Sequence, residues 1–198
     1  MIKRFNSQFA HPEGWAGRFV GMILALKNRK RNAWTISMLD IQPSDQVLEI
    51  GFGSGQAIQE VAKLTPNGFV AGIDLSDVMV EQASKRNSMA IRSGRVLLRQ
   101  GSESPLPFED NKFNKVFAVN SMQFWSNPIE GLQEIRRVLK SGGRVVITIQ
   151  PMWAKTEEEV QSVGEKLVFR LKQVGFKQVR LETRQIKPVP TVSGIGTK

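Results

Sequence analysis

Residues 47–56 constrain the fold of this chain most, because an apolar run ends in a carboxylate and three glycines follow at alternate positions. Val47, Leu48 and Ile50 predict a strand that is buried on both faces. The glycines predict a tight turn where a ligand meets bare backbone. Behind them, apolar residues recur at helical spacing over residues 57–62. A strand, a glycine turn and a helix form the nucleotide-binding corner of a doubly wound α/β sheet.

The spacing of the glycines distinguishes between nucleotides. A dinucleotide site needs the pattern G-x-G-x-x-G, but its third glycine position is occupied here by Gln56. No Lys-Ser or Lys-Thr pair follows, so the turn is not a phosphate-binding P-loop. Glu49, just before the turn, fits a cationic ligand better than a pyrophosphate. An NAD(P)-dependent oxidoreductase is therefore the less favoured alternative.

The pattern Glu49-x-Gly51-x-Gly53-x-Gly55 resembles the first motif of the class I S-adenosylmethionine-dependent methyltransferases of the type 11 group. Asp74, the loop at residues 106–108 and the helix-to-strand join at residues 139–144 fit the same family in the same order. The resemblance implies an α/β fold, a doubly wound, Rossmann-like, seven-stranded and mostly parallel sheet with helices on both faces. It also implies S-adenosyl-L-methionine as cofactor. We expect in-line transfer of its methyl group to an oxygen, nitrogen or carbon nucleophile.

The domain boundary is expected near residue 45. Residues 45–198 predict the Rossmann-like methyltransferase domain, and residues 1–44 an N-terminal helical cap whose second helix runs from Asn32 to Asp40. Residues 15–31 join an apolar helix to a basic run, so transient contact with a membrane surface is an alternative for that segment.

The remaining elements follow from periodicity and turn signals. Strands are expected over residues 69–73, 96–98, 116–119, 144–149, 178–186 and 191–197. Helices are expected from Asp77 to Asn87, after the cap Asn127, and after the cap Thr156. The segment Ser141-Gly142-Gly143 is expected to end the second of these helices.

The composition excludes several classes of site. The chain has no cysteine, which rules out disulfides, thiolate metal sites and a cysteine nucleophile and fits a reducing cytoplasm. We expect no metal, no secretory signal and a cytoplasmic location. The net charge of +10 falls mainly on residues 1–44 and 151–198. Without a large recognition domain, a small-molecule methyl acceptor is favoured over nucleic acid.

The resemblance assigns roles to the ends of the strands. Glu49 would hold the methionine end of the cofactor, and Gly51, Phe52, Gly53 and Gly55 would let the backbone approach it. Asp74 stands nineteen positions after Gly55, the offset expected of an acid that binds ribose hydroxyls. The side chains of Leu75 and Met79 would lie against the adenine, or equally be ordinary core.

Three further positions are expected to line the site. Ser102 stands where the family usually places an aspartate that contacts the adenine amino group; either Ser102 or Glu103 would replace it. Asn120 would offer its backbone carbonyl. The segment 120–125 lacks the N-P-P-aromatic motif of many nucleic-acid amino-methylating enzymes, and its residues 123–125 would either shape an acceptor pocket or fill core.

A general base is hard to identify. His11 is the only histidine and lies in the N-terminal segment, where it would suit proton transfer or be inert. The chain has no tyrosine. A carbon or activated-oxygen acceptor would need little help from a base. A non-catalytic binding module of the same fold is the remaining alternative.

Overall fold

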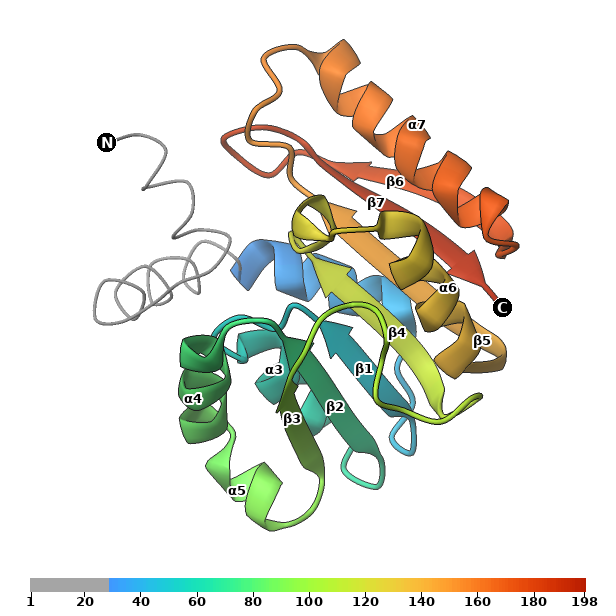
Figure 1. Ribbon diagram of the computed structural model, residues 1–198. Helices are drawn as coiled ribbons and strands as arrows, with labels where there is room; N and C mark the ends of the chain where they lie inside the picture. Colours follow the sequence, from blue (N-terminus) through green and yellow to red (C-terminus); the bar gives the residue numbers. More distant parts are fainter. Residues whose placement is uncertain (1–28) are drawn as a thin grey trace.

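A computed structural model describes residues 29–198 of the protein (Figure 1). The strands are β1 (Gln46–Ile50), β2 (Phe69–Asp74), β3 (Val96–Gln100), β4 (Phe113–Val119), β5 (Leu139–Ile149), β6 (Lys177–Arg184) and β7 (Thr191–Thr197). They form one seven-stranded sheet in the order β3-β2-β1-β4-β5-β7-β6, and β7 is antiparallel to both of its neighbours. The doubly wound, mostly parallel sheet predicted from the sequence is confirmed.

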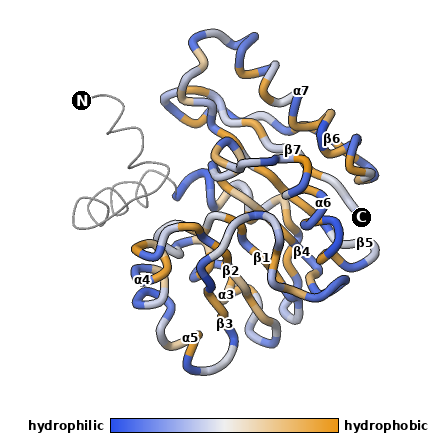
Figure 2. The backbone as a smooth tube through the Cα atoms, viewed as in Figure 1, coloured by the Kyte–Doolittle hydropathy of each residue, from blue (hydrophilic) through white to orange (hydrophobic). Residues whose placement is uncertain are grey.

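Helices cover both faces of the sheet (Figure 1). They are a helix over residues 29–39, α3 (Gln56–Leu64), α4 (Asp77–Arg86), α5 (Ser88–Arg92), the 3₁₀ turn η1 (Met122–Phe124), α6 (Pro128–Val138) and α7 (Glu157–Gln173). Figure 2 shows many apolar residues along the strands, as expected of a parallel sheet that is buried on both faces. Within the part of the chain that the structure describes, no helix is long and apolar enough to cross a membrane.

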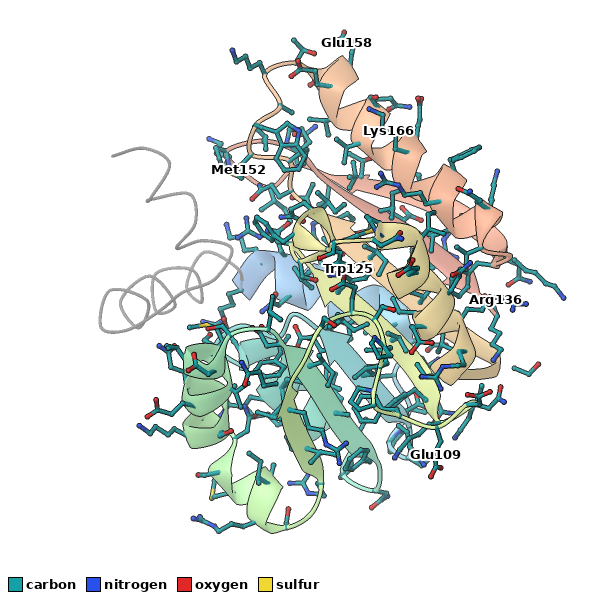
Figure 3. The ribbon with its side chains drawn as sticks, viewed as in Figure 1. Glu109, Trp125, Arg136, Met152, Glu158 and Lys166 are labelled. Atoms are coloured by element: carbon teal, nitrogen blue, oxygen red, sulfur yellow. The ribbon has the colours of Figure 1, made fainter. Side chains whose placement is uncertain are left out.

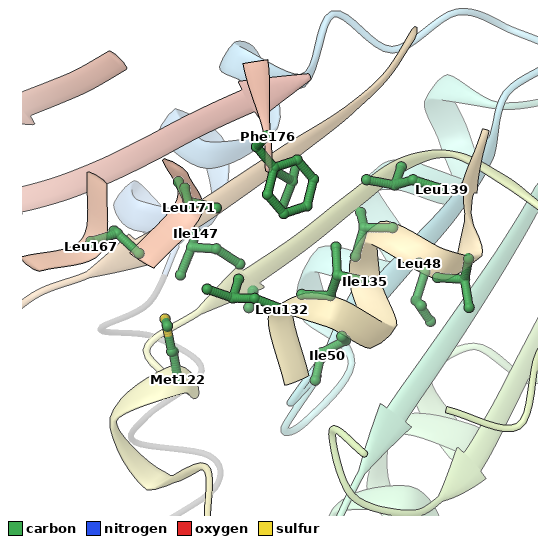
Figure 4. Packing of buried hydrophobic residues seen from close by; sticks show 14 of the residues in the cluster. Leu48, Ile50, Met122, Leu132, Ile135, Leu139, Ile147, Leu167, Leu171 and Phe176 are labelled. Atoms are coloured by element: carbon green, nitrogen blue, oxygen red, sulfur yellow. The ribbon is translucent and has the colours of Figure 1, made fainter. Parts of the chain in front are cut away.

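Alternate residues of β1 belong to two separate hydrophobic cores, one on each face of the sheet. Leu48 and Ile50 of β1 belong to the cluster under α6 and α7, whereas Val47 belongs to the cluster under α3 and the 29–39 helix. Figure 4 shows the first cluster, with buried side chains from α6, β5 and α7. Side chains from helices on both faces therefore fix β1, the strand that leads into the glycine turn.

Three side chains begin helices where the sequence predicts. The Ser76 hydroxyl accepts from Met79 N, Asn127 Oδ1 accepts from the first turn of α6, and Thr156 Oγ1 accepts from Glu159 N at 3.2 Å. Such caps satisfy backbone donors that the helix leaves without partners.

The end of α6 differs from the sequence prediction. The helix stops at Val138, three residues before Ser141-Gly142-Gly143, and β5 begins at Leu139. Leu139 is extended and pairs with Phe113 of β4, and the ladder between these strands shifts register before it resumes at Arg144. The glycines therefore lie in an irregular stretch of β5. Helix α5 was not predicted either, because its five residues carry no amphipathic pattern.

The N-terminal segment is only partly described. The helix over residues 29–39 corresponds to the predicted one from Asn32 to Asp40, and its Thr35 hydroxyl contacts that of Thr148 on β5 at 2.7 Å. His11, most of the proposed membrane-contact segment 15–31 and most of the predicted cap 1–44 lie outside the described residues.

Candidate active site

The glycine turn follows β1 at the point where the strand order reverses. β1 lies between β2 and β4, so the turn after it sits at the carboxyl edge where doubly wound sheets bind ligands. Gly51, Gly53 and Gly55 all have positive φ, at +77°, +51° and +71°. A Cβ at Gly51 would lie 2.3 Å from Ser121 Cβ, and one at Gly55 would lie 2.6 Å from Ala83 Cβ. Gly51 and Gly55 thus meet both a conformational and a steric need, and Gly53 meets a conformational one.

Helix α4 supports the turn from the other side. Asn87 Nδ2 donates to Gly55 O at 3.1 Å, and Arg86 Nε donates to Ser54 O at 2.9 Å. Sequence reasoning did not assign these two residues a role. Asn87 Nδ2 also donates to Ala83 O of its own helix at 2.9 Å, so its side chain joins the end of α4 to the turn.

Glu49 is a buried carboxylate with an unpartnered oxygen. Its side chain is 3% exposed, and Oε2 has no hydrogen-bond partner. Burial, followed by the negative charges of Asp74 and Glu60, raises the pKa of Glu49 well above its usual range, and a bond from the Ile58 backbone only partly opposes this. An unpartnered buried acceptor is costly, so it marks a place for a ligand that donates. A cationic ammonium is the group that such a carboxylate fits.

Asp74 ends β2 directly beside the glycine turn. Its Oδ2 accepts from Gly53 N at 2.7 Å, and its Oδ1 accepts from Ser76 N at 3.0 Å. Both carboxylate oxygens therefore belong to the hydrogen-bond network that joins the glycine turn to the start of α4. The structure therefore brings Glu49, the turn and Asp74 together, as the sequence predicts.

Two apolar side chains near Asp74 differ in exposure. Leu75 is 50% exposed next to Asp74, whereas Met79 is buried in the first turn of α4. Of these two side chains, Leu75 presents apolar surface to solvent at this edge and Met79 does not.

Residues 101–108 form a loop after β3, which we call the base loop. Gly101 N donates to Asp74 O at 3.0 Å, which fixes the start of the loop beside β2. Ser102 Oγ donates to Ser104 O at 2.7 Å, and Glu103 Oε1 accepts from Ser126 N at 2.8 Å. Of the two residues that the sequence offered for adenine recognition, Glu103 thus has one oxygen bound to the connection before α6.

Asn120 follows β4 in a left-handed conformation, with φ of +52°. Its N–H donates to Thr148 O at 2.8 Å, and its Oδ1 accepts from Gln150 N at 2.7 Å. The side chain of Asn120 therefore holds β5, which leaves the backbone as its contribution to the site. The next residue, Ser121, donates its hydroxyl to Ile50 O at 2.7 Å and so ties β4 to the end of β1.

The aromatic pair after β4 is divided between core and surface. Trp125 packs against the α6 core, and a Cβ at Gly131 would lie 2.9 Å from its ring. Phe124 is 49% exposed. Met152 and Trp153, on the connection after β5, are 58% and 56% exposed. Figure 3 labels Trp125 and Met152 on these two connections. Gln123 has a buried amide oxygen without a partner.

No group of three or more His, Cys, Asp or Glu side chains in residues 29–198 is arranged to hold a metal ion.

Comparison with known proteins identifies the family. The model of the methyltransferase domain matches residues 48–147. An uncharacterized methyltransferase, YdaC of Bacillus subtilis, is 34% identical over 90% of this chain and 97% of its own length. The ubiquinone/menaquinone biosynthesis C-methyltransferase UbiE of Geotalea daltonii is 29% identical over 61% of this chain, which spans about half of that protein. A solved SAM-dependent methyltransferase from Aquifex aeolicus superimposes with a TM-score of 0.68 at 20% identity, covering 88% of this chain and 96% of that one.

The fold and the comparisons thus define a class I methyltransferase. The chain belongs to the methyltransferase-domain family and is an S-adenosylmethionine-dependent methyltransferase. The prediction of cofactor and enzyme class is confirmed.

Proposed function

We propose that this methyltransferase acts on a small, largely apolar acceptor. Exposed Phe124, Met152 and Trp153 lie on the connections that follow β4 and β5, beside the strand-order reversal at which the cofactor turn sits. Large apolar side chains at such an edge favour a ligand that buries apolar surface. Relatives that include a quinone-biosynthesis C-methyltransferase support the same acceptor class.

The cofactor would lie across the carboxyl ends of β4, β1, β2 and β3. The unpartnered Oε2 of Glu49 would accept from its ammonium, and this single observation carries the assignment. The backbone of Gly51, Phe52, Gly53 and Gly55 would contact the methionine part.

The nucleoside half would lie further along the same edge. Asp74 would hold the ribose hydroxyls, and Leu75 would contact the adenine, with Met79 supporting α4 from within. Ser102 would meet the base, while Glu103 would hold the loop that carries Ser102. Asn120 would offer its backbone carbonyl on the methionine side.

Catalysis in this site would rest mainly on orientation. S-adenosylmethionine supplies a methyl group on an already activated sulfonium. The protein residues then hold the acceptor nucleophile in line with the departing sulfur and exclude water from between them. Good positioning of this kind supplies about 7–11 kcal/mol of a barrier.

The available residues favour an acceptor that needs no general base. His11 is the only histidine and tyrosine is absent from the chain. A carbon nucleophile activated by a neighbouring hydroxyl, or an oxygen that is already ionised, matches this set of side chains.

Two measurements test the proposal. Calorimetric titration with S-adenosylmethionine, S-adenosylhomocysteine and NAD should give micromolar binding of the first two and none of NAD. Transfer of a radioactive methyl group should then be assayed on a reduced naphthoquinone, a simple phenol, a primary amine and a short RNA. Transfer to the first two alone supports the proposal, and transfer only to the RNA or the amine would refute it.

A further inference from the structure

The base loop, residues 101–108, lies on the nucleoside side of Asp74. Gly101 N donates to Asp74 O, and Gln100 Nε2 donates to Leu75 O at 3.1 Å. β3 is the neighbour of β2 on the side away from β1. A nucleoside whose ribose is held at Asp74, with its methionine part at the turn after β1, therefore carries its base toward this loop.

The Ser102 hydroxyl can offer such a base only lone pairs. Its hydroxyl proton is donated to Ser104 O at 2.7 Å, so the oxygen remains as an acceptor. An acceptor at this point matches an exocyclic amino group. A keto oxygen at the same position of the base would meet another oxygen, because the Ser102 proton is already committed.

One face of α6 holds the base loop in place. Glu134 and Arg137 are three residues apart on this helix and so lie on the same side. Leu106 N donates to Glu134 Oε2 at 2.7 Å. Arg137 donates from Nη2 to Leu106 O at 3.0 Å and from Nη1 to Phe108 O at 2.8 Å. The last three residues of the loop therefore have a backbone donor and two backbone acceptors paired to this helix.

The two helix residues also fix each other. Arg137 Nε and Nη2 donate to the two oxygens of Glu134 at 2.7 and 2.8 Å, which is a bidentate pair. The bond from Arg137 lowers the pKa of Glu134, so its carboxylate stays ionised and accepting. A lysine at position 137 would keep the charge but lose the forked geometry.

The loop has a second attachment near the start of α6. Glu103 Oε1 accepts from Ser126 N, and a Cβ at Gly131 would lie 2.8 Å from Glu103 Cγ. Gly131 precedes Glu134 by three residues, so the same helix face receives both ends of the loop. Ser102 lies between these attachments and the end of β3.

We propose that Glu134 and Arg137 are positioning residues that hold the base loop so that Ser102 selects an amino-bearing purine. This inference rests on the proposed placement of the cofactor. Neither residue touches the ligand; both act through the backbone of Leu106 and Phe108.

The test compares two ligands that differ at one position of the base. S-adenosylhomocysteine carries an amino group where S-inosylhomocysteine carries a keto oxygen. Dissociation constants for both are measured by calorimetry on the wild type, Glu134→Gln, Arg137→Gln and Arg137→Lys. Arg180→Gln is the matched control, since Arg180 forms an exposed pair with Glu182 on β6 at the opposite edge of the sheet.

The wild type and the control should prefer the adenosyl ligand by at least about tenfold, the size of one good hydrogen bond. Glu134→Gln and Arg137→Gln should lose most of that preference, and Arg137→Lys should fall between. A general loss of stability would weaken both ligands together and leave their ratio unchanged. An unchanged ratio in these variants, or no preference in the wild type, would overturn the inference.

The design also separates this inference from the proposed function. If the wild type binds neither ligand, the cofactor placement itself fails. If Glu134→Gln does not fold, the ratio measured on Arg137→Lys decides, because that variant keeps the charge that faces Glu134 and Asp110.

Discussion

The Asp74 carboxylate accepts a hydrogen bond from Gly53 N–H at 2.7 Å. The residue that is proposed to bind the ribose therefore also shapes the turn that is proposed to receive the methionine part. Because the other oxygen accepts from Ser76, the same side chain sets the start of α4. One carboxylate thus links β2, the glycine turn and the start of α4 in the proposed cofactor site.

Replacing Asp74 should weaken cofactor binding more than loss of one ligand contact would. For Asp74→Ala we expect the dissociation constant of S-adenosylhomocysteine to rise about 10–100-fold, from hydrogen bonds to a charged group worth about 1.5–3 kcal/mol. Asp74→Asn keeps one accepting oxygen and should lie between. Calorimetry measures this, and an Asp74→Ala protein that binds as the wild type does would remove Asp74 from the site.

Glu49→Gln should reduce the pH dependence of the stability of the ligand-free protein. The raised pKa of Glu49 means that the folded protein holds a proton which the unfolded chain releases near pH 4.3. Stability of the ligand-free protein should therefore fall as pH rises from that value through the folded pKa. Urea unfolding at several pH values should show this decline in the wild type and a smaller one in Glu49→Gln.

Cofactor binding should show the opposite pH dependence at the same residue. A bound ammonium favours the carboxylate form, so binding to protonated Glu49 releases a proton, and affinity should rise with pH up to the pKa of the free site. Titrations in two buffers of different ionisation enthalpy count the protons released. The ligand amino group titrates equally in Glu49→Gln, so equal proton release in both proteins would argue against Glu49 as the ammonium partner.

Alanine at Gly51 should cost far more than alanine at Gly53. Both positions are left-handed, which costs about 1–2 kcal/mol for alanine. Only at Gly51 would the new Cβ also overlap Ser121, since Gly53 faces open space. Urea unfolding should rank the variants in this order. Adding Ser121→Gly to Gly51→Ala should recover part of the loss, and the absence of recovery would show that the overlap is not its cause.

The exposed aromatics should matter for the acceptor and not for the cofactor. Phe124→Ala and Trp153→Ala should raise KM for an apolar acceptor about tenfold, because full burial of such a side chain is worth about 1.5–3 kcal/mol. KM for S-adenosylmethionine should stay within twofold. Phe169→Ala is the control, as it removes an exposed ring that lies on α7 and on neither connection. Equal effects of all three would exclude a specific acceptor surface.

Gln150→Leu should destabilise the fold by at least about 2 kcal/mol, because it leaves buried polar groups without partners. Gln150 Oε1 accepts from Arg31, and its Nε2 donates to Ile186 O at 2.5 Å and Val189 O at 2.7 Å. The amide thus joins the 29–39 helix to the connection between β6 and β7. Urea unfolding gives the loss, and a stability change below about 0.5 kcal/mol would contradict this role.

The features that could be predicted from the sequence depend on residues that lie close together along the chain. The unit from β1 to α3 is fixed by contiguous residues, namely a buried strand, glycines with positive φ and an amphipathic helix. Ser76 and Asn127 cap their helices through bonds that span two or three residues. Such features need no knowledge of distant segments, so a reader of the sequence can place them.

The rest depends on contacts between segments far apart in the sequence. Glu103 could not be assigned between ligand and scaffold, because its partner Ser126 lies 23 residues away. The bonds from Arg137 to the base loop span about 30 residues, although the pair Glu134 and Arg137 at helical spacing offered a faint signal. The start of β5 at Leu139 could not be predicted either. Its pairing with Phe113, 26 residues away, outweighs the local helix propensity.

Strand β7 is the last of the described strands along the chain, yet it lies between β5 and β6. During synthesis, β6 therefore has no neighbour to pair with until residues 191–197 have been added. A nascent or truncated chain that stops before Thr191 would leave the edges of both β5 and β6 open, and such edges template aggregation. Because β7 pairs with β5 and β6 at once, a chain that lacks residues 191–197 should aggregate more readily than one that includes them.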